Sequence, residues 1–111
     1  MKIERVSLLN FRQYFGEHRV RFAQHDQQNV TVIHGVNGAG KTSFFLALNW
    51  CLYGEGVENI GQITSKEAVS RAKVGDEVTT KVTITFLHEG ERYMASRQLT
   101  GRKRSDGSLD E

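Results

Sequence analysis

The arrangement of apolar and polar residues predicts β-strands toward the beginning of the chain. Residues 2–11 have a strand-like composition with one slip in their alternation, which a β-bulge would explain. After a turn expected at residues 14–17, polar and apolar residues alternate over residues 18–23, which predicts a hairpin with one solvated face. Residues 29–34 form a β-branched run that is typical of a buried strand.

A helix is predicted soon after this run. From Lys41 to Tyr53 there is no Gly or Pro, and Gly54 can supply the left-handed residue that commonly ends a helix. Apolar side chains lie almost all round this segment, which favours a helix buried against a sheet over an amphipathic surface helix. These residues are Phe44, Phe45, Leu46, Leu48, Trp50, Cys51, Leu52 and Tyr53.

A short helix and a longer hairpin are predicted in the second half of the chain. Residues 64–74 are predicted to be helical, because Thr64 and the glutamate three residues later make a capping-box pattern. Alternate positions are apolar over residues 78–87, which indicates a strand with one buried face. A turn at residues 88–91 leads into a partner strand at residues 92–99, so this segment is predicted to be an antiparallel hairpin.

Length and composition limit the chain to one small domain. It has 111 residues, of which 38% are hydrophobic, and a net charge of +2. We expect residues 1–100 to form the domain and residues 101–111, whose one apolar residue is Leu109, to form a disordered polar tail. The basic triplet at residues 102–104 is offset by nearby acids, which favours a solvated tail over a nucleic-acid contact.

Targeting segments and metal-binding patterns are not found in the sequence. It has neither a signal peptide nor an apolar stretch of membrane-spanning length, so a cytoplasmic location and no membrane partner are expected. Cys51 is the single cysteine, and it is interpreted as a small buried hydrophobic residue. The four histidines do not show metal-ligand spacing.

The most specific chemical motif is at residues 35–42, which read Gly-Val-Asn-Gly-Ala-Gly-Lys-Thr and fit the P-loop pattern. Glycines allow backbone N–H groups to converge on phosphate oxygens, and the start of the following helix adds its positive end. Lys41, the candidate catalytic residue, is placed to reach the outer phosphates, and the Thr42 hydroxyl is placed to bind Mg²⁺. The sequence therefore predicts a site for a nucleoside triphosphate and magnesium.

Hydrolysis needs a further group. A P-loop ATPase uses an acidic residue at the end of a second core strand, and after the motif no apolar run ends in such a residue. We therefore expect that the chain binds nucleotide but does not hydrolyse it alone. Two alternatives stay open, namely a fragment of a small P-loop kinase or GTPase and a structural lobe that folds only with its partner. The sequence does not contain a guanine-specifying Asn-Lys-x-Asp segment, which counts against a GTPase.

Two features together resemble a known family. Asn37 stands before the central glycine of the P-loop, and the first strand leads into Leu9-Asn10-Phe11-Arg12. This combination resembles the N-terminal lobe of the SMC and RecF class of ABC-type ATPases. The strings at residues 10–14, 32–35 and 47–54 are most similar to the DndD family of that class, ATPases linked to DNA phosphorothioate modification and restriction. The resemblance implies an α/β fold, the P-loop NTPase N-terminal lobe, with a mixed β-sheet, a buried helix after the P-loop and an antiparallel β-hairpin.

The resemblance also implies an activity and partners. It implies an ATPase that uses ATP and Mg²⁺ and that acts on DNA, in repair or in phosphorothioate modification and restriction. In this class a long coiled coil separates the N-terminal lobe from a C-terminal lobe that carries the metal-site acids. Two such heads form an ATP-dependent homodimer. The C-terminal lobe of the same ATPase, DNA and other DNA-processing proteins are therefore the expected partners.

Site residues follow from the resemblance by position. The phosphate-binding loop of the family is matched by Asn37, Gly38, Ala39, Gly40, Lys41, Thr42 and Ser43. Arg12 matches an arginine that reaches the nucleotide in these lobes, although the residues alone equally allow a surface arginine. Thr64 lies where the family's connector passes the nucleotide base, and a role as a helix cap is an equal alternative.

Overall fold

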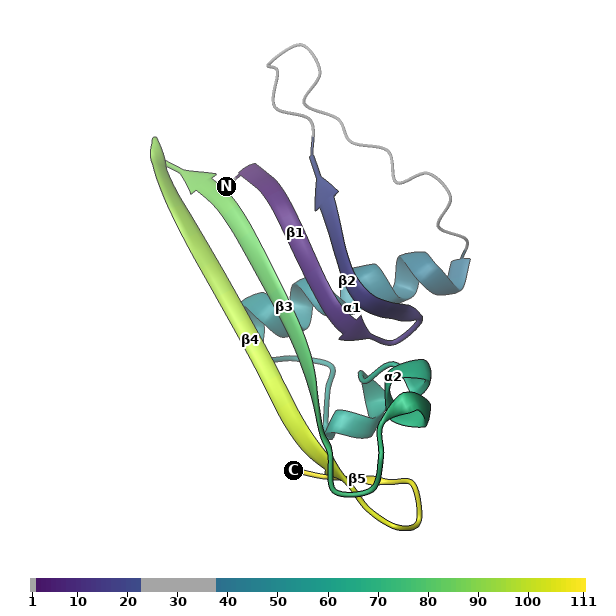
Figure 1. Cartoon of the computed structure of the whole chain (residues 1–111). Helices are drawn as coiled ribbons and strands as arrows, with labels where there is room; N and C mark the ends of the chain where they lie inside the picture. Colours follow the sequence, from purple (N-terminus) through teal and green to yellow (C-terminus); the bar gives the residue numbers. More distant parts are fainter. Residues whose placement is uncertain (1, 23–37) are drawn as a thin grey trace.

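The computed structural model describes residues 2–22 and 38–111, and it contains one sheet with a long helix against one face (Figure 1). The elements are β1 (Lys2–Phe11), β2 (Tyr14–Arg21), α1 (Gly38–Tyr53), the 3₁₀ helix η2 (Ile60–Gln62), α2 (Lys66–Arg71), β3 (Glu77–His88), β4 (Glu91–Lys103) and β5 (Leu109–Asp110). The strand predicted at residues 29–34 and the first part of the P-loop, including Asn37, lie outside the described residues.

Both predicted hairpins are present and share one sheet. The strand order is β2-β1-β3-β4-β5, and β1 pairs with both β2 and β3. The long hairpin of β3 and β4 confirms the alternation seen at residues 78–99, with Val82 opposite Arg97 and Ile84 opposite Ala95. Every described pairing is antiparallel. The expectation of a mixed sheet stays a prediction, because the strand predicted at residues 29–34 lies outside the described residues.

The two faces of the sheet differ. The face that packs against α1, here called the helix face, contributes side chains that are fully buried: Val6 and Leu8 from β1, and Val82 and Ile84 from β3. They meet a row of buried side chains on α1: Phe44, Ala47, Trp50 and Cys51. The opposite face, here called the open face, carries the alternate residues, including Arg5, Ser7, Arg19, Arg21, Lys81, Thr83 and Thr85. In Figure 1, α1 crosses behind the sheet and no described helix lies over β1 and β3 in front.

Helix α1 ends as predicted but is buried on only part of its surface. Gly54 has a positive φ angle of 70°, and its N–H donates to the Trp50 carbonyl at 2.8 Å, which closes the last turn. The prediction of a helix buried against a sheet is confirmed, and the burial is one-sided, because Phe45 is 56% exposed and Tyr53 is 65% exposed. The sheet covers one side of the helix, and no other described element covers these two rings.

The first turn comes earlier than predicted. Strand β2 already begins at Tyr14, and Arg12 and Gln13 make the turn, so the expected turn at residues 14–17 is wrong. Asn10 and Arg12 both have a positive φ angle of 52°. The Asn10 side-chain oxygen accepts the Gly16 N–H at 2.9 Å, which ties the two strands together at this point.

Helix α2 is shorter than predicted, and its cap is a different residue. It spans Lys66–Arg71, and the Ser65 hydroxyl accepts the Ala68 N–H at 3.3 Å. The capping role expected of Thr64 is therefore wrong. Thr64 instead forms an antiparallel bridge with Phe11, and its hydroxyl is bonded to that of Thr80 at 2.8 Å.

The segment expected to be a disordered tail is ordered. Strand β4 continues to Lys103, and β5 returns to pair with it, with Arg102 opposite Asp110. The physical reason is packing at Gly101: a Cβ there would lie 3.0 Å from the Leu109 Cβ and 3.2 Å from the Ile60 Cδ1, so the missing side chain makes room for both residues. The charges that were expected to be solvated also form a pair, since Arg104 contacts Asp110 at 2.9 Å.

Candidate nucleotide-binding site

The P-loop motif leads into the beginning of α1. The helix begins at Gly38, inside the motif, so the free N–H groups of its first turn belong to motif residues. Asn37 lies outside the described residues, and for residues 38–41, including Gly38, Ala39, Gly40 and Lys41, only the helical backbone is described. The structure therefore places a helix N-terminus, the positive end of the helix dipole, at the predicted phosphate site.

The two hydroxyl residues after Lys41 differ in accessibility. Thr42, the fifth residue of α1, is exposed, whereas Ser43 is 2% exposed and packs into the interior. In P-loop NTPases a Ser or Thr of the loop holds Mg²⁺. Of these two residues, Thr42 is the one that the protein core does not enclose, and its role toward Mg²⁺ stays a prediction. Among the described residues, no cluster of three or more His, Cys, Asp or Glu side chains offers a separate metal site.

Arg12 and Thr64 are brought together by the fold. Both line a surface pocket of about 420 Å³. Its wall also includes Gln13, Gln62, Ser65 and Lys66. The Arg12 N–H donates to the Ile63 carbonyl at 2.6 Å, and Phe11 bridges to Thr64, so the β1–β2 turn and the connector before α2 are locked side by side. Two residues that the resemblance assigns to the nucleotide thus share one wall.

The Thr64 side chain itself faces the protein interior. The residue is 6% exposed, and its hydroxyl is bonded to Thr80 at 2.8 Å. The Thr80 hydroxyl in turn donates to the Asn10 carbonyl at 3.3 Å. Thr64 therefore contributes to the pocket wall from a position in which its hydroxyl already has a structural partner.

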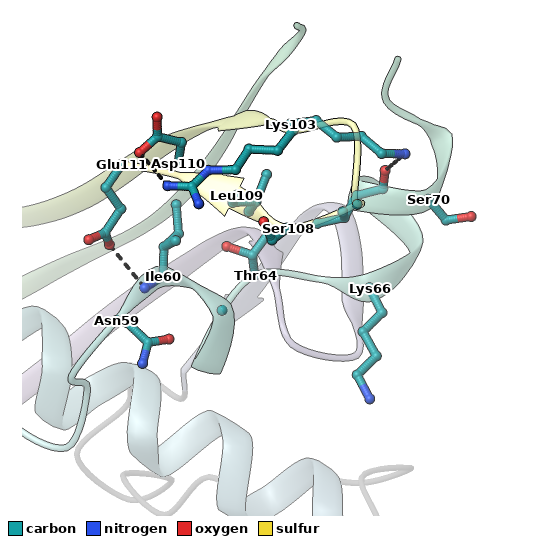
Figure 2. A pocket seen from close by; sticks show the side chains of 14 residues that line it. Asn59, Ile60, Thr64, Lys66, Ser70, Lys103, Ser108, Leu109, Asp110 and Glu111 are labelled. Carbon is teal, nitrogen blue, oxygen red and sulfur yellow. Dashed lines mark hydrogen bonds and ion pairs between the residues drawn. The ribbon is translucent and has the colours of Figure 1, made fainter. Parts of the chain in front are cut away.

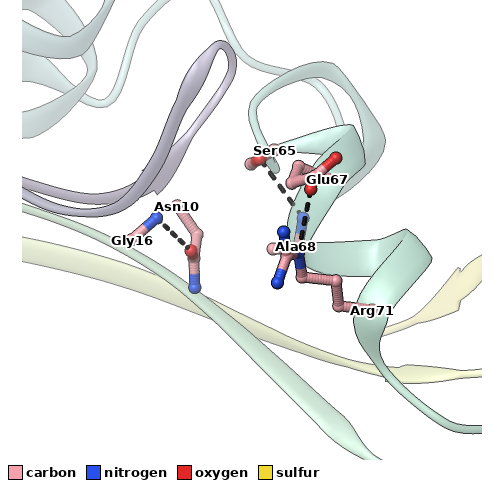
Figure 3. A network of polar contacts seen from close by, with 6 residues as sticks. All are labelled: Asn10, Gly16, Ser65, Glu67, Ala68 and Arg71. Carbon is pink, nitrogen blue, oxygen red and sulfur yellow. Dashed lines mark hydrogen bonds and ion pairs between the residues drawn. The ribbon is translucent and has the colours of Figure 1, made fainter.

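Asn10, for which the sequence predicted no individual role, organises this turn (Figure 3). Its side chain accepts the Gly16 N–H and donates to the Thr79 carbonyl at 3.2 Å, while its own carbonyl accepts the Ser65 N–H at 2.8 Å. It thereby fastens the turn that carries Arg12 to β3 and to the start of α2. An asparagine two residues before an arginine at a strand end is a weak signal, although asparagine is among the few residues that tolerate the left-handed conformation.

A further pocket, of about 830 Å³, lies between η2, α2 and the β4–β5 hairpin (Figure 2). Lys103 Nζ donates to the Val69 and Ala72 carbonyls at 2.8 Å each, which completes the C-terminal end of α2. Glu111 accepts the Ile60 N–H at 2.9 Å. These charged groups are occupied by structural contacts, and we assign no chemistry to this pocket.

The thiol of Cys51 lies between α1 and the sheet. Its Sγ is 3.4 Å from the Val82 carbonyl oxygen and 3.6 Å from that of Ala95. Burial raises the pKa of Cys51 above its ordinary value, which keeps the group as an uncharged thiol at neutral pH. This matches its interpretation as a small buried hydrophobic residue.

Over the described residues, no helix combines the length and the apolar character that a membrane span requires.

Comparison with known families and structures gives consistent matches. The family model described as AAA domain matches residues 5–110. The DNA double-strand break repair Rad50 ATPase of Halobacterium salinarum is 34% identical over 99 residues, which is 89% of this chain and 10% of that protein. Arcadin-4 of Pyrobaculum calidifontis is 42% identical over 57 residues, which is 51% of this chain and 6% of that protein. The chain thus spans a tenth or less of these relatives.

A solved structure is similar over nearly the whole chain. It comes from work on ATP-driven dimerization and DNA stimulated activation of SMC ATPases, and it superposes with a TM-score of 0.63 at 20% identity. The match covers 98% of this chain and 67% of that one. The likeness shows the fold, which is consistent with the predicted α/β fold of a P-loop NTPase N-terminal lobe.

Proposed function

The chain belongs to the AAA domain family, and on that premise we propose that it is the ATP-binding lobe of an SMC/Rad50-like ATPase that acts on DNA. The observation that carries the proposal is the position of the Gly-Ala-Gly-Lys-Thr segment at the N-terminus of α1, in a lobe that has the SMC ATPase fold. Such a terminus offers converging N–H groups and a positive dipole end to phosphate oxygens.

Each motif residue has a role in this proposal. The backbone of Gly38, Ala39 and Gly40 holds the phosphates, and Lys41 neutralises the outer ones. Thr42 holds Mg²⁺, which when bound shields the charge of the phosphates, while Asn37 and Ser43 complete the loop. Arg12 extends its guanidinium toward the nucleotide, and Thr64 forms part of the wall near the base. The shared pocket wall of Arg12 and Thr64 supports this last pair of roles.

Hydrolysis, in this proposal, needs protein outside this chain. The C-terminal lobe supplies the metal-site acids across a coiled coil, and two heads form an ATP-dependent homodimer. The similarity to a Rad50 ATPase supports DNA repair as the process, with other DNA-processing proteins as partners. The second candidate process is DNA phosphorothioate modification and restriction, in which DndD ATPases act. It rests on the similarity of residues 10–14, 32–35 and 47–54 to that family. The 111-residue chain by itself binds ATP without turning it over.

Isothermal titration with Mg²⁺ and ATP tests the proposal. Replacing Lys41 by alanine removes a charge-assisted contact worth about 1.5–3 kcal/mol, so the Lys41→Ala chain is expected to bind ATP about 10 to 150-fold more weakly. Lys73→Ala, which removes an exposed lysine outside the motif, is the control and is expected to bind like the original chain. Equal affinity of the original and Lys41→Ala chains would contradict the proposal.

Competition between GTP and ATP separates the proposal from its enzymatic alternative. A clear preference for GTP would favour a GTPase fragment instead. The structural alternative is tested by thermal unfolding of the chain with and without the C-terminal lobe of the parent protein. A large rise in Tm on adding the lobe, without ATP binding by either sample, would favour a purely structural lobe.

A further inference from the structure

A hollow on the open face of the sheet is lined by guanidinium groups from three strands. Its volume is about 380 Å³, and its lining residues are Arg5 of β1, Arg21 of β2 and Arg92 of β4, together with Glu4 and Thr85. None of these side chains is apolar. We call this feature the arginine hollow.

The pairing register places two of these arginines directly against each other. Arg5 is opposite Arg21 in the β1–β2 ladder, so both side chains leave the sheet on the same face. Neither forms an ion pair with any described residue, and both are exposed. Like charges in directly opposite positions destabilise a sheet. The hollow therefore holds positive charge that the described part of the protein does not neutralise by an ion pair.

A β-bulge accounts for the one acidic group in the hollow. Ile3 pairs with Phe86 and Arg5 pairs with Thr85, so Glu4 is the extra residue of β1. A bulge of this kind re-aims a side chain. The Glu4 carboxylate accepts two hydrogen bonds from Arg92, at 2.8 and 3.2 Å. The ion pair of Glu4 is with Arg92, and Arg5 acts on the same carboxylate through a weaker Coulombic attraction.

The character of the lining distinguishes between possible partners. Protein interfaces are anchored by aromatic and apolar side chains in their centre, and the arginine hollow has none. Guanidinium and hydroxyl groups are the usual contacts to phosphate oxygens. Beyond the hollow, in the direction of the β1–β2 turn, the open face continues with Ser7, Arg19, Lys81 and Thr83, with Glu17 paired to Arg19 at 2.7 Å. The exposed apolar side chain of Met94 lies beside the hollow, opposite Thr85.

We propose that the arginine hollow binds the sugar-phosphate backbone of a nucleic acid, with Arg5 and Arg21 as its main phosphate contacts. The inference rests on the proposed function only in taking nucleic acid as the partner. It does not depend on bound ATP, because its residues are separate from the P-loop, Arg12 and Thr64. Contact with the backbone alone gives affinity without sequence preference.

The test measures binding of a fluorescent DNA duplex to the full chain, without nucleotide, over a range of salt concentrations. The Arg5→Gln/Arg21→Gln variant removes two phosphate contacts, so the slope of log affinity against log salt is expected to fall by about 2, for every duplex sequence alike. The control is Arg71→Gln/Lys73→Gln, which removes the same charge from α2 and the segment after it. It is expected to change the slope by less than about 1. An equal effect of both variants, or no effect of the first, would overturn the proposal.

Further measurements distinguish loss of the phosphate contacts from a folding defect, and nucleic acid from another class of partner. The glutamine variant should have a Tm equal to or above that of the original chain, because it relieves cross-strand repulsion. Arg5→Lys/Arg21→Lys keeps the charge and should keep the slope, and loss of binding in this variant would refute a phosphate contact. Displacement of the DNA by polyglutamate at equal charge concentration would point to an acidic protein instead. The Arg5→Gln/Arg21→Gln variant should keep its affinity for ATP, so failure of ATP binding and failure of the hollow are seen separately.

Discussion

The helix face and the open face belong to the same strands, yet they differ in almost every physical property. On the helix face Val6, Leu8 and Ile84 are 0% exposed and pack under α1. On the open face Arg5 and Arg21 stand side by side in solvent. Side chains alternate along a strand, so one stretch of sequence can supply both surfaces. Folding stability is therefore concentrated on one face, which leaves the other free to carry charge.

In strand β1 the alternation of side chains between the two faces is interrupted at two places. Its alternation slips twice, once near Glu4 and once between Leu9 and Phe11. The first slip aims Glu4 at Arg92 on the open face. The second accompanies the left-handed Asn10 and Arg12, which shape the turn beside the candidate nucleotide site. Both irregularities therefore lie next to residues with a proposed function.

The strongest test of the contrast is a cavity on the helix face. Phe11 is 0% exposed, and its ring lies 6.1 Å from that of Trp50, between centroids. Phe11→Ala is expected to lower the free energy of unfolding by about 3–5 kcal/mol, measured by urea denaturation. Ser7→Ala, on the open face of the same strand, is the control and should stay within about 0.5 kcal/mol of the original. Similar losses in both variants would show that the two faces do not differ in this way.

A smaller effect is expected from the polar pair on the helix face. Thr80→Val leaves the buried Thr64 hydroxyl without its 2.8 Å partner, at a cost of about 1–3 kcal/mol in unfolding free energy. Adding Thr64→Val should recover most of that loss, because no unpaired hydroxyl remains. Thr83→Val, on the open face of β3, is the matched control and should be near neutral. If the double variant is less stable than Thr80→Val, the hydroxyl pair is not the cause.

The smallest effect is expected on the open face, from the pair of Glu4 and Arg92. The side-chain hydrogen bond from Arg92 lowers the pKa of Glu4 below its ordinary value of 4.5. The folded-state pKa is thus lower than the unfolded one, so the pair stabilises the fold above pH 4.5 and this contribution is lost as the pH falls through the lowered pKa. The Tm difference between the original chain and Glu4→Gln should be small at neutral pH and shrink in acid. A difference that grows in acid would contradict this sign.

Local patterns predicted the elements well where they did not depend on distant contacts. The alternation over residues 78–87 and the glycine after Tyr53 identified β3 and the end of α1 correctly. The cap of α2 was missed because Phe11, far away in sequence, takes Thr64 into a bridge. The order in residues 101–111 was missed for a related reason, since Leu109 packs where Gly101 and Ile60 leave room.

The candidate nucleotide site and the arginine hollow also show that contacts between distant segments cannot be predicted from local sequence. The P-loop is contiguous in sequence, so its chemistry is readable from eight successive residues. The position of Arg12 beside Thr64 depends on contacts between β1 and the connector before α2. Arg5, Arg21 and Arg92 come from three strands, and only the register of those strands shows that they meet.

The buried thiol of Cys51 can report when helix α1 separates from the sheet. It is the single cysteine, it is 4% exposed, and it lies where α1 meets β3 and β4. A thiol reagent can reach it only when the helix lifts from the sheet, so the rate of labelling measures how often that happens. Comparing this rate with and without ATP would show whether a ligand at the front of α1 holds its far end in place.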